Sequence, residues 1–194
     1  MKTPNQSIAR ANTRDWVHSV FQISLAACGS VLVVSQDMTL DAFLEHIEDK
    51  QPLANDWDIV RFERSLGVSL AADYRAFLQR CNGGYAGGSV WDFERGVGVH
   101  HVGGFRDEEH FSLRSHYDSL REFLPADMIP IADDPFGNAI CLGVSGASVG
   151  KIYFWDHESA EDVPAHVADS FTAFVGRLEE QEDEKRANRV AGSN

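Results

Sequence analysis

Cysteine is scarce in this sequence, and its cysteines are widely separated. The 194 residues include three, Cys28, Cys81 and Cys141, and no CxxC motif occurs. This spacing predicts neither a zinc knuckle nor a disulfide framework. Cys81 and Cys141 lie within apolar patterns that are typical of small core residues. A reducing cytoplasm is the simplest compartment for such a chain, so we expect a cytoplasmic protein.

Basic residues are also few relative to acidic ones. Lysine and arginine total 17 against 30 aspartates and glutamates, which gives a formal net charge of −13. Because phosphate backbones repel such a surface, the composition predicts no direct binding of nucleic acid. A protein with this charge associates readily with a basic partner. Alternatively, the negative charge has no binding role and only keeps the protein soluble.

The N-terminal segment lacks an uninterrupted apolar run. Residues 16–34 read WVHSVFQISLAACGSVLVV, where polar side chains interrupt a stretch of marginal length for a membrane span. Within it, Leu25-Ala26-Ala27-Cys28 resembles a lipobox, the site at which bacterial lipoproteins are cut and lipidated. The alternatives are an element packed on the domain or an upstream extension of the reading frame, with Met38 as the working start. We treat residues 1–37 as an N-terminal extension and expect no membrane association unless Cys28 is lipidated.

No phosphate-binding motif occurs, although residues 80–89 (RCNGGYAGGS) contain four glycines. A phosphate-binding loop lies between a strand and the N-terminus of a helix, where N–H groups and the helix dipole attract an anion. Here the order is reversed, because the stretch follows a predicted helix and precedes a predicted strand. Neither GxGxxG nor a Gly-Lys-Ser/Thr ending is present. Asn82-Gly83-Gly84 is predicted to form a left-handed helix cap, after which Gly87-Gly88 turn the chain into the sheet.

Catalytic and metal-binding motifs are absent as well. No HExxH or HxH pattern occurs, and no GxSxG elbow between a strand and a helix is present. Adjacent side chains on a strand point to opposite faces, so His100 and His101 are not expected to share one ion. The loop from Asp133 to Asn138 lacks the ligand pattern of an EF-hand, and its Asn and Gly predict a tight turn. A cation site in this loop and a hydrolase built on the histidine-rich middle are the alternatives. The sequence therefore predicts no catalytic residue, metal ligand or cofactor, and no enzyme.

Amphipathic helical patterns and short strand patterns make up most of the chain. Apolar stripes at helical spacing predict helices at 39–49, 56–67, 70–81 and 167–178, and over much of 105–124. Short apolar runs between turn residues predict strands at 89–94, 96–102, 128–133, 139–144 and 150–156. Asp56 is expected to cap the second helix, and Gly67 to lie just past its end. The charged C-terminal tail, 181–194 with the two glutamates before it, is expected to prolong the last helix.

Five short motifs occur in an order that resembles a known superfamily. They are ERSLG (63–67), LAADYRAFLQRCNGG (70–84), IPIADDPFGNAICLG (129–143), GKIYFWDHE (150–158) and SFTAFVGRL (170–178). Together they resemble the SUKH superfamily, the Smi/Knr-type domain named after a fungal cell-wall assembly regulator. The resemblance covers about residues 40–180, so we place the domain at 38–180. One departure is Ala71, which stands where these domains usually have proline.

The resemblance implies an α+β fold with a curved, mainly antiparallel sheet and amphipathic helices packed around it. It also implies a protein-binding function without catalysis. Many bacterial members resemble immunity proteins of toxin systems, which bind and block a cognate toxin domain, often a nuclease or a deaminase. Fungal members resemble scaffolds in cell-wall signalling. We therefore expect an immunity protein with a basic toxin domain as its partner, or alternatively a regulatory scaffold without one.

Partner-binding residues are expected among aromatic and acidic side chains at loops and strand ends. Aromatic anchors supply buried area, and carboxylates pair with the lysines and arginines of a basic partner. The candidates are Tyr85, Trp91, Asp92, Glu94, Asp133, Asp134 and Phe136. In the alternative interpretation, alternation along residues 89–94 buries Trp91 and Phe93 and leaves Asp92 and Glu94 outside.

Overall fold

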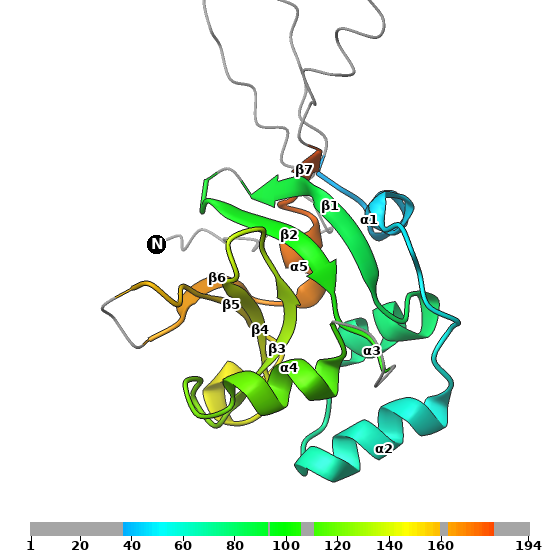
Figure 1. Ribbon diagram of the computed structural model, residues 1–194, viewed down its shortest axis with the longest axis vertical. Coiled ribbons are helices and arrows are strands. Elements are labelled where there is room, and N and C mark those ends of the chain that lie inside the picture. The colour runs from blue at the N-terminus through cyan, green and yellow to red at the C-terminus, as the bar shows by residue number, and fades with distance from the viewer. Residues whose placement is uncertain (1–36, 93, 106–110, 160–162, 181–194) are drawn as a thin grey trace, which may run out of the picture. The chain divides into compact units, whose positions relative to one another are not determined.

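A computed structural model describes residues 37–92, 94–105, 111–159 and 163–180 (Figure 1). The expected lipobox, nearly all of the extension at 1–37 and the tail at 181–194 lie outside these residues. The helices are α1 (Leu40–His46), α2 (Asp56–Leu66), α3 (Ala72–Arg80), α4 (Leu113–Leu120), the short 3-10 turn η1 (Gly146–Ser148) and α5 (Phe171–Val175). The strands are β1 (Gly84–Asp92), β2 (Val97–Val102), β3 (Met128–Asp133), β4 (Ala139–Gly143), β5 (Ile152–Trp155), β6 (Ala165–Ala168) and β7 (Glu179–Glu180). No helix of the described chain has both the length and the apolar character that crossing a membrane requires.

The seven strands form one antiparallel sheet in the order β6-β5-β4-β3-β2-β1-β7. Strands β1 to β6 are a meander, in which each strand pairs with the next one along the chain (Figure 1). A bulge between Pro130 and Ala132 bends β3. The α+β class and the mainly antiparallel sheet expected from the sequence are thus confirmed.

Local capping chemistry sets where the first two helices begin and end. The Thr39 side chain accepts a hydrogen bond from the Ala42 N–H and begins α1. Helix α2 begins with a capping box in which the Asn55 side chain and the Asp58 side chain each accept a backbone N–H from the other. Asn55 is therefore the cap, and the prediction of Asp56 was wrong by one residue. Gly67, with a φ of 69°, ends α2 in the left-handed conformation that the sequence predicts.

Apolar side chains from both faces of the sheet are buried. The main cluster joins strand residues such as Ile140 and Leu142 to side chains from all five helices, including Tyr74 of α3. A smaller cluster on the other face contains Cys141 and is covered by residues around the end of α4. Cys81 and Cys141 are both fully buried, which confirms their expected place in the core.

Two predicted helices are shorter than the sequence suggests. Within 105–124, α4 begins only at Leu113, where the Ser112 side chain accepts from the Ser115 N–H. Within 167–178, the first residues belong to strand β6, and α5 begins after Ser170, which accepts from the Ala173 N–H. The side chains of the predicted apolar stripe are buried as expected, but the first of them, Val167, belongs to strand β6 and not to the helix. Glu179 and Glu180, predicted to prolong this helix, instead pair with β1 as strand β7.

The glycine-rich stretch lies mostly within strand β1 rather than in a turn. Helix α3 ends at Arg80, and its C-cap Cys81 has an extended φ of −148°, so the helix does not end in the predicted left-handed cap. Gly83, two residues later, does adopt the positive φ that the prediction requires, 83°. Tyr85 pairs with His101 and Val90 pairs with Val99, so four residues of β1 lie opposite His100 alone. The predicted turn at Gly87-Gly88 is therefore a large bulge opposite His100, in which Gly87 adopts a φ of 72°.

Candidate functional site

Two of the predicted partner-binding carboxylates are buried. Asp92 is 2% exposed, and its Oδ2 lies 2.9 Å from Arg177 Nε, so the idea that it lies outside is wrong. Asp134 is 3% exposed and is held within its own turn. A buried charge needs an ion-pair partner or hydrogen bonds, and Asp92 and Asp134 both have them within the chain. Both carboxylates therefore stabilise the fold and are not available to a partner.

The other candidates differ in accessibility. The Glu94 side chain is 80% exposed and lies 3.4 Å from Arg177 Nη2. Tyr85 is half-buried on β1, and the Phe136 residue is 68% exposed. Trp91 pairs with Gly98 on the backbone, and its side chain lies outside the description. Asp133 belongs to a separate polar cluster with His100 and His101.

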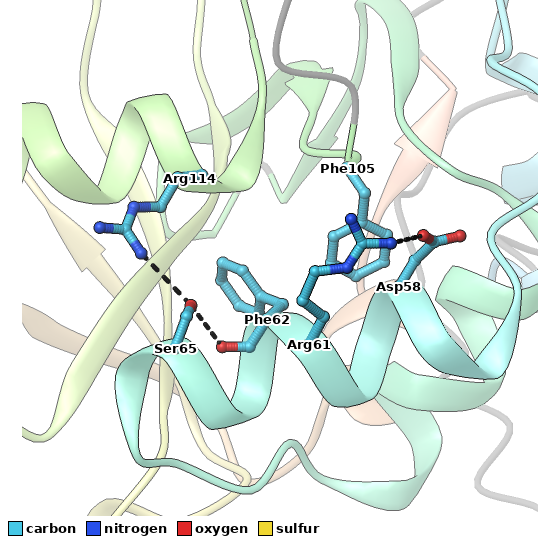
Figure 2. A pocket seen from close by; sticks show the side chains of 6 residues that line it. All are labelled: Asp58, Arg61, Phe62, Ser65, Phe105 and Arg114. Carbon is cyan, nitrogen blue, oxygen red and sulfur yellow. Dashed lines mark hydrogen bonds and ion pairs between the residues drawn. The ribbon is translucent and has the colours of Figure 1, made fainter.

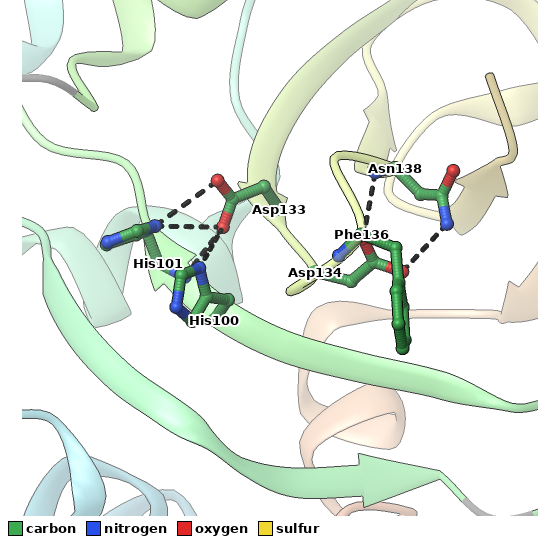
Figure 3. Close-up of polar contacts among 6 residues, drawn as sticks. All are labelled: His100, His101, Asp133, Asp134, Phe136 and Asn138. Atoms are coloured by element: carbon green, nitrogen blue, oxygen red, sulfur yellow. Dashed lines mark hydrogen bonds and ion pairs between the residues drawn. The ribbon is translucent and has the colours of Figure 1, made fainter.

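The turn from Asp134 to Asn138 is rigidly built and presents Phe136. Asp134 Oδ1 accepts from the backbone N–H groups of Phe136 and Asn138, both at 2.8 Å (Figure 3). Asn138 Nδ2 donates to Asp134 Oδ2, while Asn138 Oδ1 accepts from the His157 backbone N–H at 3.2 Å. The tight turn expected from the sequence is confirmed. Asn138 also links it to the loop after β5, so Phe136 and His157 come from adjoining loops.

Aromatic side chains gather beside this pair of loops. Phe123, after α4, stacks on Trp155 of β5 with ring centroids 6.4 Å apart, and the Trp155 and His157 rings are also 6.4 Å apart. Phe123 is 63% exposed, and Trp155 is half-buried. We define Phe123, Phe136, Trp155 and His157 as the aromatic patch. Exposed aromatic rings of this kind are typical anchors in protein interfaces.

A second cluster, His100, His101 and Asp133, joins the end of β3 to β2 (Figure 3). Asp133 Oδ1 accepts the His101 backbone N–H at 2.7 Å and lies 3.2 Å from His101 Nδ1 and 3.8 Å from His100 Nδ1. The expectation that adjacent histidines point apart is wrong here. Strands β2 and β3 pair only at Val102 and Ala132, and the β1 bulge faces His100, so strict alternation does not hold. We refer to these three residues as the histidine cluster.

The histidine cluster is partly shielded from solvent and borders a pocket. The side chains of His100, His101 and Asp133 are 29%, 36% and 20% exposed. Burial raises the pKa of the Asp133 carboxyl, although the His101 N–H and both imidazoles oppose this effect. The rings of Tyr85 and Phe111 lie 5.3 and 5.8 Å from that of His101. All three aromatic side chains line a pocket of about 460 Å³.

A second, smaller pocket of about 230 Å³ lies between α2 and α4 (Figure 2). Phe62 and Phe105 meet edge to face, 5.6 Å apart, and Arg61 and Arg114 flank them. Both arginines already have acidic partners: Arg61 Nη2 lies 2.9 Å from Asp58, and Arg114 Nε lies 2.7 Å from Asp118. The guanidinium charges are compensated within the chain, so this pocket does not favour an anionic ligand.

The two cysteine thiols of the described residues, Cys81 and Cys141, are buried. Burial raises the pKa of the Cys81 thiol to about 11, and it raises that of Cys141 further. Both thiols therefore stay protonated near neutral pH. His116 is also largely buried, which lowers its pKa to about 4 and keeps the imidazole neutral.

Comparison with known proteins finds a family model, a curated relative and a solved structure. A prophage-derived protein of Bacillus subtilis (strain 168), the uncharacterized SPbeta protein YokK, is 29% identical over 137 residues, which cover 60% of this chain and 70% of that protein. A crystal structure of a protein from Pseudomonas syringae pv. tomato aligns with a TM-score of 0.46 and 16% identity, covering 63% of this chain and 85% of that one. The model of the SMI1 / KNR4 family (SUKH-1) matches residues 53–177. Since this match spans more than half of the chain and includes every helix and strand from α2 to α5, the chain belongs to the SMI1 / KNR4 family (SUKH-1), as the resemblance of its motifs indicates.

Proposed function

We propose that this protein is an immunity protein, which binds a basic bacterial toxin domain and blocks its activity. Membership of the SUKH family, which includes toxin immunity proteins, supports this proposal most directly. The formal charge of −13 supports the sign of the partner, because an acidic surface attracts and orients a basic protein. We place the complex in the cytoplasm, where a cell exposed to such toxins requires protection.

The aromatic patch is the surface that we assign to the partner. Phe123 and Phe136 are exposed, Phe123 stacks on Trp155, and Asn138 ties the Phe136 turn to the loop after β5. A preorganised surface loses little conformational entropy when it binds. Two exposed carboxylates, Asp156 and Glu158, lie in that same loop, and the Glu158 N–H donates to Asp156 Oδ1 at 2.9 Å. Aromatic anchors next to acidic side chains suit a partner whose surface is rich in lysine and arginine.

Inhibition by binding requires no chemistry from this chain. The buried, protonated thiols of Cys81 and Cys141 fit this mode of action. In the mechanism that we propose, the protein occupies the active site or the substrate path of the toxin, and affinity alone determines protection. The histidine cluster lies on β2 and β3 and takes no part in this proposal.

The test is a growth-rescue assay combined with affinity capture. The toxin domain encoded beside this gene is expressed with and without the protein, and complex formation is measured in moderate salt. We expect restored growth and a one-to-one complex. Phe123→Ala and Phe136→Ala should each weaken binding by about 2 kcal/mol, or roughly 30-fold in Kd, if the patch contains the anchors.

Matched variants separate the patch from general effects of truncation and charge. Trp57→Ala removes a ring of similar exposure, 71%, from helix α2 and should leave the affinity unchanged. Asp156→Lys should slow association and reduce its salt dependence, because less attraction remains for salt to screen, whereas Glu45→Lys, exposed on α1, should do neither. If growth is restored but neither patch variant weakens binding, the interface lies outside the aromatic patch. Failure of both rescue and complex formation would overturn the immunity function and favour a scaffold of the cell-wall-regulator type.

A further inference from the structure

We propose that the histidine cluster binds one divalent transition-metal ion of the Zn²⁺ type. His100, His101 and Asp133 each contribute one potential ligand atom, and these atoms lie within 4.8 Å of one another. The separations from Asp133 Oδ1 to the two Nδ1 atoms are 3.2 and 3.8 Å. In a tetrahedral zinc site, bonds of about 2.0–2.1 Å place ligand atoms roughly 3.3 Å apart. The three side chains therefore approach a metal-binding geometry without rearrangement of the backbone.

The ligand set selects the class of metal. Two imidazole nitrogens and one carboxylate oxygen suit Zn²⁺, Co²⁺ or Ni²⁺, whereas Ca²⁺ and Mg²⁺ prefer sites made of oxygen alone. Three protein ligands leave at least one coordination position for water or for an external group. His101 also lines the 460 Å³ pocket, so a molecule in that pocket has access to the ion.

Electrostatics and packing favour occupancy. Asp133 is a partly desolvated carboxylate, and a bound divalent cation would compensate its charge. Tyr85 meets both imidazoles at ring-centroid distances of 5.1 and 5.3 Å, and Phe111 stacks on His101. The backbone N–H of His101 also fixes the carboxylate. These contacts hold the donors close together while about a third of each imidazole remains accessible to an entering ion.

The experiment titrates the chelator-treated full chain with Zn²⁺ in competition with a chromophoric chelator, and with Co²⁺ by visible absorption. We expect one tight site per chain, with cobalt d–d bands and no thiolate-to-cobalt charge-transfer band, since the ligands are nitrogen and oxygen. His100→Gln and His101→Gln should each weaken Zn²⁺ binding about tenfold or more. Asp133→Asn, which keeps an oxygen for the His101 N–H, should do the same.

His166→Gln is the matched control. This imidazole is 44% exposed and lies 3.2 Å from the Asp169 carboxylate, but no third ligand in the described residues joins it in a cluster. Its substitution should leave the tight site intact. Circular dichroism of each variant without metal shows whether the fold is retained, and the half-exposed His101 side chain makes His101→Gln the safest substitution. Absence of tight binding, binding that survives the His100→Gln/His101→Gln double variant, or a thiolate band would each overturn the proposal.

Discussion

Arg177 joins three parts of the fold, and replacing it with methionine tests how much its charge contributes. Its Nε lies 2.9 Å from Asp92 at the end of β1, its Nη1 donates to the Val167 carbonyl at 2.8 Å, and its Nη2 approaches Glu94. Methionine keeps much of the apolar stem and removes the guanidinium. The variant therefore leaves the Asp92 carboxylate, which is 2% exposed, without its cation.

The expected loss follows from the burial of this carboxylate. Removing one partner of a buried ion pair costs about 3–5 kcal/mol, and we expect the lower end because the Arg177 side chain is 29% exposed. A loss of about 3 kcal/mol lowers Tm by roughly 6–12 °C in a chain of this size. Urea unfolding followed by tryptophan fluorescence measures the free energy directly.

Two further variants show whether the buried charge is the cause. Adding Asp92→Asn to Arg177→Met removes the stranded charge but keeps an oxygen for the Arg95 N–H, and should recover about 1–2 kcal/mol. Arg61→Met breaks an ion pair at a 77% exposed side chain and should cost less than about 0.5 kcal/mol. If Arg177→Met costs no more than Arg61→Met, the assignment of stability to the buried pair is incorrect.

Two other predictions concern titration and packing. Burial lowers the pKa of His116 from 6.5 to about 4, so below pH 6.5 the unfolded chain binds a proton that the native chain does not. This group therefore reduces stability as the pH falls from 6.5 to 4, by up to about 3 kcal/mol, and His116→Gln should flatten the dependence of urea midpoints over that range; equal slopes would contradict it. A Cβ at Gly104 would overlap the carbonyl oxygen of Asn82, so Gly104→Ala should cost about 1–3 kcal/mol or more, measured by thermal unfolding. Gly176→Ala, whose Cβ would meet its nearest atoms at 3.6 Å, should stay within about 0.5 kcal/mol, and equal losses would refute the packing argument.

Local patterns predicted the fold best where one signal dominates. Strand β3 has the predicted bounds because an apolar run at 128–133 is closed by turn residues. The region of α5 was less predictable. Val167 and Phe171 have helical spacing, yet Val167 lies in strand β6, which pairs with β5. The helix begins only after Ser170, its N-cap. Tertiary pairing there outweighs the helical pattern, which no short window of sequence shows.

The candidate sites depend on contacts between distant segments. Asp92 was expected to be a solvent-facing carboxylate because alternation along the strand suggests it, and its true partner is Arg177 near the end of the domain. The histidine cluster was missed because the rule of alternation holds only in regular strands. One sequence signal was available: glycines at 87 and 88 permit a bulge, and a bulge changes where facing side chains point.

The outer edge of β1 has a consequence for how molecules of this protein meet one another. Glu48 pairs with Tyr85 near one end of the strand, and β7 pairs with Val90 and Trp91 near the other. Both ends of this edge are thus occupied by segments of the same chain, which obstructs strand addition by a second molecule. The covering strand consists of Glu179 and Glu180, so an approaching copy meets negative charge at the same place. On this side, the fold thereby discourages edge-to-edge aggregation of a sheet whose central strands are strongly apolar.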